Sequence, residues 1–161
     1  RWDVFEGRYE GRLAQALGDL RSLDPPMPGK RLLAALDVAG LQRQAGLPGV
    51  AGTTARRILN RDFVQVAFYG PQELLAQHAI PQAIASLEVA VAIRPENETV
   101  WYNLACARSR GGQVKAALEA LGRAVDLGFK DAALLASDPD LDAVRRREGF
   151  PLLLARLRPS P

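Results

Sequence analysis

The sequence predicts an all-α protein built from antiparallel pairs of helices, and three features of its 161 residues support this. Apolar residues recur every three or four positions through most of the chain, the spacing that places them on one face of a helix. Glycine and proline clusters interrupt these stretches where helices would end. One periodic stretch also occurs twice at a fixed separation, which indicates a helical repeat.

The composition is that of a folded protein without a strongly charged face. Hydrophobic residues make up 48% of the chain, charged residues 24%, and the net charge is +3. Arginines alternate with acids, as in Arg8-Tyr9-Glu10, so we expect no nucleic-acid partner. We also expect no membrane span, because no apolar run is long enough, and we see no signal peptide. The chain opens on Arg1, which suggests a fragment or processed product, and its cellular compartment is unknown from the sequence.

The amino-terminal part predicts two helices before any repeat. Trp2, Phe5, Tyr9 and later leucines give a helical face as far as Leu23, and the proline-rich residues 24–29 end it. A second helix is predicted over 30–45. Neither helix is related to later ones by a fixed offset.

A glycine-rich stretch, residues 46–54, comes next and leads into another helix. It lacks the lysine of a phosphate-binding loop and follows a helix instead of a strand. We therefore predict an ordinary loop in which Thr53 or Thr54 caps a helix that begins at Ala55. That helix should run from Arg56 to Tyr69, kink at Gly70-Pro71 and continue to Gln77, because Pro71 removes an amide donor and crowds the carbonyl of Ala67.

The repeated stretch lies between residues 83 and 129. In it, seven positions precede seven similar ones by 34 residues: Ala83, Ile84, Leu87, Ala90, Val91, Ile93 and Pro95 precede Ala117, Leu118, Leu121, Ala124, Val125, Leu127 and Phe129. Before the second copy, Trp101, Leu104 and Ala107 form another apolar stripe that stops at Gly111-Gly112. The alternative is two unrelated helices rich in alanine and leucine.

With this period, the chain resembles the tetratricopeptide repeat family. The residues that carry the resemblance are Trp101, Leu104, Ala105, Gly112, Ala117, Leu121 and Ala124 in one copy and Ala83, Leu87, Ala90 and Pro95 in the other. The resemblance implies a right-handed helical solenoid of antiparallel helix pairs, here with extra amino-terminal helices. Arg108 departs from the family pattern, which usually has a large aromatic residue at that position.

After Phe129 the sequence resembles the segment that closes many bacterial arrays of this family. A short helix is predicted over 131–136, and Ser137-Asp138-Pro139 is a signal for the start of another. Such a segment would cover the open end of the last repeat. We thus predict three parts: 1–52, an amino-terminal helical segment and loop; 53–131, two repeat-like helix pairs; and 132–161, carboxy-terminal capping helices.

The sequence offers no catalytic, cofactor or metal site. The one histidine, His78, and the one cysteine, Cys106, have no partners at the spacing of a metal site, and no nucleophile-elbow motif is present. Cys106 lies within a helical run, so we expect a buried structural thiol. We interpret Asp138, Asp140 and Asp142 as cap and first-turn residues of helices.

In the family, the first helix of each repeat lines the groove that binds a partner. This implies a groove lined by Gln65, Phe68, Tyr69, Gln72 and Leu75 from one copy and by Thr99, Tyr102, Asn103, Cys106, Ser109 and Arg110 from the other. The expected partner-binding residues are Phe68, Tyr69, Gln72, Tyr102, Asn103, Ser109 and Arg110. The alternative for Phe68, Tyr69 and Tyr102 is packing against the amino-terminal helices.

The predicted function is a non-catalytic scaffold that binds a protein or peptide segment. The family's clamp for a free peptide carboxylate uses lysines and paired asparagines, and Tyr69 stands at the counterpart of Asn103, so we do not expect that clamp. The alternative function is an accessory region of a larger bacterial enzyme such as a hydrolase, in which case the partner includes the rest of the same chain.

Overall fold

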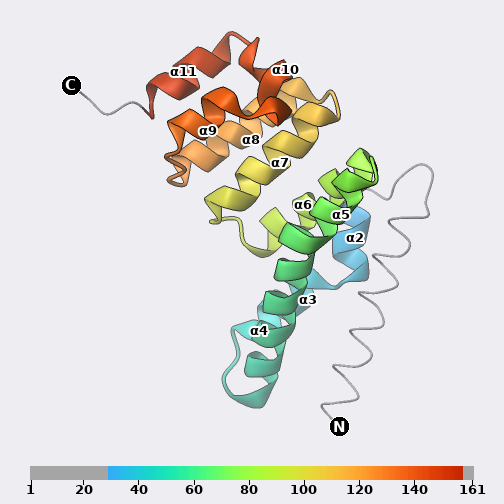
Figure 1. The fold of residues 1–161 in the computed structure, drawn as a ribbon. Coiled ribbons are helices and arrows are strands. Elements are labelled where there is room, and N and C mark those ends of the chain that lie inside the picture. Colours follow the sequence, from blue (N-terminus) through green and yellow to red (C-terminus); the bar gives the residue numbers. More distant parts are fainter. Residues whose placement is uncertain (1–28, 158–161) are drawn as a thin grey trace. The chain divides into compact units, whose positions relative to one another are not determined.

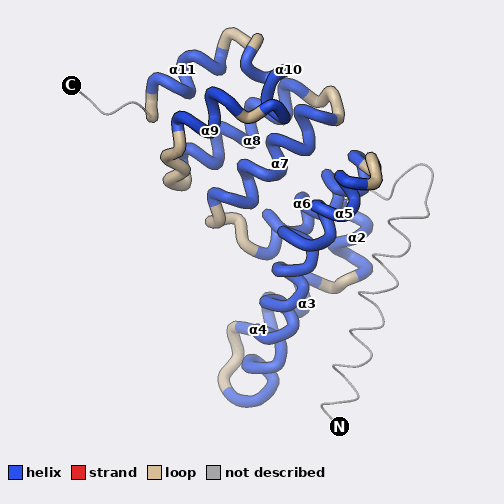
Figure 2. Tube along the Cα trace, in the orientation of Figure 1, coloured by secondary structure: helices blue, strands red, loops and turns tan. Residues whose placement is uncertain are grey.

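The computed structural model describes residues 29–157, and every regular element in that range is a helix (Figures 1 and 2). The predicted helix over 2–23 and the tail from Arg158 lie outside the described residues. The chain forms two compact units, residues 1–94 and 95–161. The predicted division into three parts stays a prediction.

The first unit is built around one central apolar helix, α6. Its elements are α2 (Gly29–Ala35), α3 (Val38–Ala45), α4 (Gly49–Val64), the π-helical turn η1 (Gln65–Tyr69), α5 (Gly70–Ala76) and α6 (Ile80–Ile93). Helices α2, α4 and α5 and the turn η1 all pack against α6. Its buried residues include Ala83, Leu87 and Ala90, which are three of the repeated positions.

Two helices, α2 and α3, replace the single helix predicted over 30–45. The chain breaks at Asp37, whose φ of 48° lies in the left-handed region, and the Asp37 carboxylate accepts a hydrogen bond of 3.2 Å from the amide of Gly40. Asp37 is therefore the cap of α3. The prediction was wrong here because the apolar period continues through the break, with Leu36 and Val38 both buried.

Helix α4 begins at Gly49, six residues before the predicted start. Pro48 holds the cap position, and no side chain of the described residues caps the helix. Thr53 lies inside the helix, where its hydroxyl donates to the carbonyl of Gly49 at 3.0 Å, and Thr54 is buried. The predicted threonine cap is wrong, because these threonines continue the helix instead of turning the chain.

Just before Gly70-Pro71, where a kink was predicted, the helix has one π-helical turn, η1. The amide of Gly70 donates to the carbonyl of Gln65, five residues earlier. In the same pattern the carbonyl of Val66 would accept from residue 71, but Pro71 lacks an amide. The hydroxyl of Ser86 on α6 donates to that carbonyl instead, at 2.9 Å inside the core. The sequence predicted an irregular helix here. The Ser86 hydroxyl satisfies the buried Val66 carbonyl that the irregular turn leaves without an amide donor.

The second unit is a helical hairpin closed at one side by shorter helices. Its elements are α7 (Glu98–Arg110), α8 (Val114–Asp126), α9 (Ala132–Ser137), the 3-10 turn η2 (Pro139–Leu141), α10 (Asp142–Arg145) and α11 (Gly149–Ala155). Helices α7 and α8 pack closely, as predicted, and Gly112 turns the chain between them with a φ of 74°. We call residues 129–157 the closing segment. Within it, Asp131 caps α9, and Asp138 caps η2 as predicted.

The core of this unit joins the hairpin to the closing segment. It contains Ala117, Leu121 and Ala124 of α8, each fully buried, together with Leu135, Leu141, Val144 and Phe150. Trp101, predicted to be buried, is only half-buried at the edge of this core. Its indole N–H donates to the carbonyl of Pro95 at 2.9 Å, and the Arg123 guanidinium lies 5.8 Å from the centre of its ring.

Candidate partner-binding site

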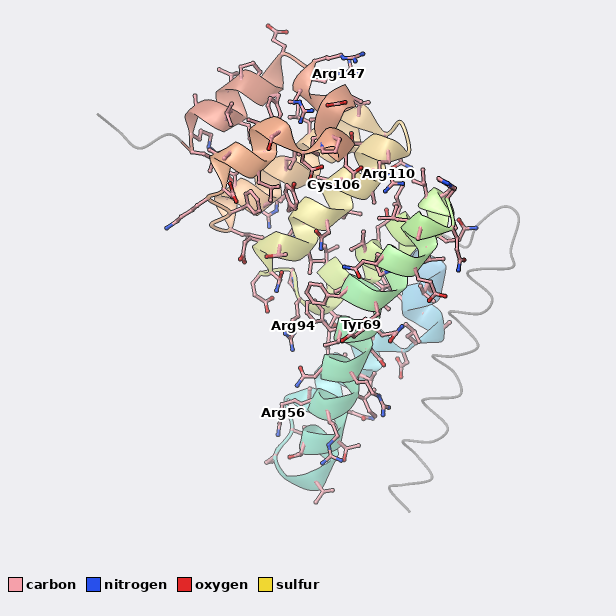
Figure 3. The ribbon with its side chains drawn as sticks, viewed as in Figure 1. Arg56, Tyr69, Arg94, Cys106, Arg110 and Arg147 are labelled. Carbon is pink, nitrogen blue, oxygen red and sulfur yellow. The ribbon has the colours of Figure 1, made fainter. Side chains whose placement is uncertain are left out.

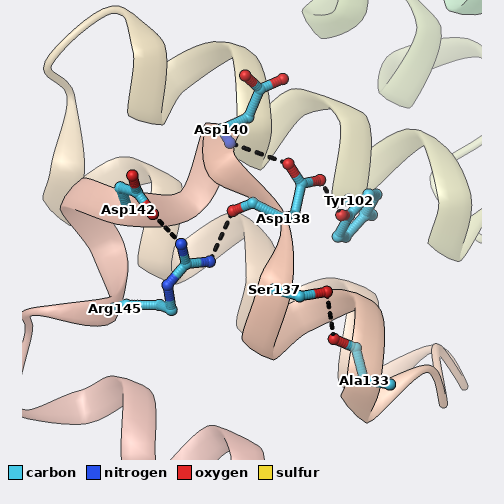
Figure 4. A network of polar contacts seen from close by, with 7 residues as sticks. All are labelled: Tyr102, Ala133, Ser137, Asp138, Asp140, Asp142 and Arg145. Carbon is cyan, nitrogen blue, oxygen red and sulfur yellow. Dashed lines mark hydrogen bonds and ion pairs between the residues drawn. The ribbon is translucent and has the colours of Figure 1, made fainter.

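Tyr102, predicted to bind a partner, is buried within the second unit. Its ring stacks on that of Phe129, with centroids 4.6 Å apart and planes 8° from parallel. Its hydroxyl donates a hydrogen bond to the carboxylate of Asp138 (Figure 4). The sequence predicted that Tyr102 either lines a partner groove or packs against the amino-terminal helices. Its observed neighbours, Phe129 and Asp138, belong instead to the closing segment. That segment covers the ring.

Asp138 is the centre of a polar network that attaches the closing segment to α7. Besides Tyr102, its carboxylate accepts from the Cys106 thiol at 3.7 Å and from the amide of Asp140 at 2.9 Å. Arg145 donates to the carbonyl of Asp138 at 2.6 Å and pairs with Asp142 (Figure 4). The turn η2 is thus fixed on the face of α7 that the family resemblance assigns to partners.

This burial changes the acid-base properties of the enclosed groups. Burial, and next the neighbouring Asp138 carboxylate, raises the pKa of the Cys106 thiol from 9.0 to about 12. Burial, and next its hydrogen bond to Asp138, raises the pKa of Tyr102 far above its usual range. Both groups stay protonated at neutral pH, so Cys106 has no thiolate with which to act as a nucleophile.

The other predicted residues of α7 differ in their accessibility. Ser109 is buried, and its hydroxyl has no hydrogen-bond partner among the described residues. Asn103 is half-buried and Arg110 is exposed, where its guanidinium lies 3.8 Å from the carboxylate of Asp140 (Figure 3). Thr99 is also exposed. A partner of this helix could therefore reach Thr99, Asn103 and Arg110, whereas Tyr102, Cys106 and Ser109 are covered.

The predicted residues of the first unit form an accessible surface. Tyr69 is 65% exposed and Gln72 is exposed, while Phe68 is half-buried with its ring edge-to-face on Phe63 at 5.9 Å. The Arg94 guanidinium lies 4.3 Å from the centre of the Phe63 ring on the same unit. We call Val64, Phe68, Tyr69 and Gln72 the Tyr69 surface. Gln65 and Leu75 beside it are half-buried.

Sequence reasoning missed the roles of Phe129 and Asp138. Asp138 was interpreted correctly as a cap, but its contact with Tyr102 joins residues 36 positions apart. A lone acid in a cap motif gives no signal of a distant tyrosine. The four-residue spacing shows that Tyr102 and Cys106 share one face of the helix. It does not show whether that face is exposed to solvent or covered by another segment.

The described residues also bear on two other kinds of site, a metal centre and a membrane span. No three His, Cys, Asp or Glu side chains in the described part of the chain are placed to hold a metal ion. His78, in the turn between α5 and α6, is exposed. No described helix combines the length and the apolar character needed to cross a bilayer.

Residues 74–140 match the family model of the tetratricopeptide repeat, from the middle of α5 through η2. Over these residues the chain has the sequence pattern of the tetratricopeptide repeat family. The chain is also similar to a chloroplastic protein of Arabidopsis thaliana, with 34% identity over 82 residues. That match covers 49% of this chain and 24% of the plant protein. No solved structure matches the chain.

The match explains the observed register. Ala83, Leu87 and Ala90 on α6 and Ala117, Leu121 and Ala124 on α8 are all almost fully buried, as expected for equivalent second helices of two tetratricopeptide repeats. Phe68, Tyr69 and Gln72 lie just before the matched residues, and Tyr102, Asn103, Ser109 and Arg110 lie within them. The relative is a plant protein, so the predicted bacterial origin stays a prediction.

Proposed function

We propose that this tetratricopeptide repeat protein is a non-catalytic scaffold that binds a segment of another protein. Tetratricopeptide repeats generally mediate interactions between proteins, and the match of residues 74–140 to the family model supports this role. The proposal concerns which surface binds, and the Tyr69 surface supports it best.

The exposure of Tyr69 carries this proposal. Among the described residues, Tyr69 is the one exposed phenylalanine, tyrosine or tryptophan, and it lies on the first helix of the first repeat. A tyrosine has a large amphipathic ring and few rotatable bonds, so it gives contact area at low entropic cost. Val64, five residues earlier, is 42% exposed, and the Gln72 amide can donate and accept hydrogen bonds to an extended backbone. Aromatic anchors surrounded by polar groups are typical of binding surfaces.

Helix α7 contributes less to this proposal than its position in the repeat implies. Arg110 can pair with an acidic partner only in competition with Asp140, which already lies 3.8 Å away. Asn103 is half-accessible. We therefore place the contacts with the partner on the Tyr69 surface of the first unit. A short surface of this kind binds an isolated peptide weakly, in roughly the micromolar to millimolar range.

The experiment is a capture of partners from a lysate of the source cells, followed by peptide-array mapping. We expect Tyr69→Ala/Gln72→Ala to lose the partners that the wild-type chain captures. The matched control is Leu152→Ala, which removes a side chain that is 71% exposed on the second unit. Equal capture by wild type and the double variant would show that the Tyr69 surface is not the binding site.

An accessory region of a larger bacterial hydrolase is the second candidate from the sequence. The similarity to the plant relative covers only 24% of that protein, so most of the relative lies outside the matched region. That observation favours repeats attached to other domains, without favouring a hydrolase. The reading frame around the coding sequence tests this candidate: a hydrolase domain in the same frame supports it, and an isolated repeat domain removes it.

A further inference from the structure

The hairpin of α3 and α4 has an unusual charge pattern that the scaffold function does not use. Residues 38–61 contain four arginines, Arg43, Arg56, Arg57 and Arg61, and no aspartate or glutamate. The rest of the chain mixes the two signs. The two arginines nearest the turn, Arg43 and Arg56, are both exposed, and no acid lies between Asp37 and Asp62 in the sequence.

The tip of this hairpin is apolar. Leu47 and Val50, on either side of Pro48-Gly49, are 53% and 62% exposed. They are two large apolar side chains at the turn, with Arg43 in the last turn of α3 and Arg56 in α4, bonded to Ala45 at the end of α3. Exposed single apolar residues are common, but two at one tip, flanked by cations, are a recognisable combination.

Hydrogen bonds hold the tip in this conformation. Arg56 donates to the carbonyl of Ala45 at 2.5 Å and to the hydroxyl of Thr53 at 3.2 Å, which ties the end of α3 to the start of α4 (Figure 3). The amide of Leu47 donates to the carbonyl of Gln44 at 2.9 Å. Since the turn is already ordered, binding through it costs little conformational entropy.

We propose that the α3–α4 hairpin docks on the surface of an anionic lipid bilayer. The leucine and valine of the tip enter the boundary between headgroups and acyl chains, and the flanking arginines lie against the negatively charged headgroups. A bilayer fits this tip because it accepts protruding apolar side chains without a shaped pocket, while its diffuse negative charge matches cations spread over two helices. The association is peripheral and reversible, since one apolar tip and a few arginines do not anchor a protein permanently.

The test is sedimentation of the whole chain with vesicles of phosphatidylcholine alone and with about one-third phosphatidylglycerol, at low and at high salt. We expect binding to the anionic vesicles that falls with salt, and little binding to the neutral ones. Leu47→Ser/Val50→Ser should lower the partition coefficient by about tenfold, the effect of losing two partly buried apolar side chains. Arg43→Glu should lower it by at least about fivefold.

Matched controls lie on the second unit. Leu152→Ser removes an apolar side chain that is 71% exposed, and Arg146→Glu reverses an exposed charge, so neither should change vesicle binding. Thermal melts by circular dichroism verify that each variant folds. Binding that is insensitive to the hairpin variants, or equally affected by the controls, would overturn the proposal. Binding to poly-L-glutamate but not to anionic vesicles would also overturn it and indicate an acidic protein as the partner of the hairpin.

Discussion

The helices that precede α6 and α8 differ, although the sequence predicts equivalent positions for them in two repeats. In the second repeat, α7 is a regular helix capped by Asn97, and the closing segment buries its Tyr102. In the first, residues 65–76 contain a π-helical turn, and Tyr69 is exposed. Pro71 stands where the second repeat has Ala105, 34 residues later. The first of these helices is therefore irregular next to Pro71, and the second is covered by the closing segment.

The second helices differ in a way that follows from the first. Ser86 on α6 donates to the Val66 carbonyl, which Pro71 cannot serve, and its counterpart on α8 is Ala120. The regular helix α7 has no proline at the equivalent position, so an apolar residue suffices there. The comparison shows that a repeat can absorb a proline in a buried helix when the neighbouring helix supplies one hydroxyl.

The largest expected effect separates the two tyrosines. Tyr102→Ala should lower the free energy of unfolding by about 3 to 5 kcal/mol, because it removes a buried ring and leaves Asp138 with one donor fewer. Tyr102→Phe keeps the stack with Phe129 and should cost about 1 to 3 kcal/mol. Urea denaturation measures both. If Tyr102→Ala were nearly neutral, the closing segment would not cover α7.

Overpacking should come next and affect the second repeat at its closest contacts. Ala117→Leu and Ala124→Leu should each cost about 1 to 3 kcal/mol, since both alanines are fully buried and a larger side chain must displace its neighbours. Leu152→Ala serves as the exposed control. Neutral results at both alanines would contradict the close packing of α8 in the core.

The Ser86 hydroxyl should contribute to the free energy of unfolding only when Pro71 leaves the Val66 carbonyl without an amide donor. Ser86→Ala should cost about 1 to 3 kcal/mol by leaving the Val66 carbonyl buried and unsatisfied. In a Pro71→Ala background the restored amide can donate within the helix, so the same substitution should cost clearly less. A double-mutant cycle measures this coupling. Equal costs in both backgrounds would mean that Pro71 does not create the need for Ser86.

Alkaline pH should destabilise the second unit through Cys106. Its folded pKa of about 12 exceeds the ordinary 9.0, so folding favours the protonated thiol, and this contribution is complete below pH 9 and is lost as the pH rises toward 12. At pH 10 the loss is about 1 to 2 kcal/mol. Cys106→Ala should show a shallower fall of the melting temperature between pH 8 and 10, and an unchanged slope would contradict the raised pKa.

The smallest expected effect is at Tyr69. Tyr69→Ala should change the free energy of unfolding by less than about 0.5 kcal/mol, because the side chain is 65% exposed. Measured with Tyr102→Ala in the same urea titration, it gives the contrast between the two helices directly. A cost near that of Tyr102→Ala would mean that Tyr69 is a core residue, as in the alternative interpretation of the sequence.

The sequence by itself determined the helices and the repeat. The 34-residue offset between Leu87 and Leu121, the glycine turn at Gly112 and the cap at Asp138 all rest on local spacing and local backbone chemistry, which are written along the chain. The kink at Pro71 was predictable for the same reason. Local rules failed at Asp37 and Thr53, where the apolar period runs through a break and a threonine bonds back inside a helix.

Only the tertiary structure decided which face of each first helix is open. Helical spacing places Tyr102, Cys106 and Ser109 beside the apolar stripe, but spacing does not say what lies opposite. Phe129 and Asp138 of the closing segment contact Tyr102, and the exposure of Tyr69 depends on packing around α6. Burial depends on contacts between residues that are distant in the chain. A single sequence shows the chemical character of each residue, but it does not show which distant residues are in contact.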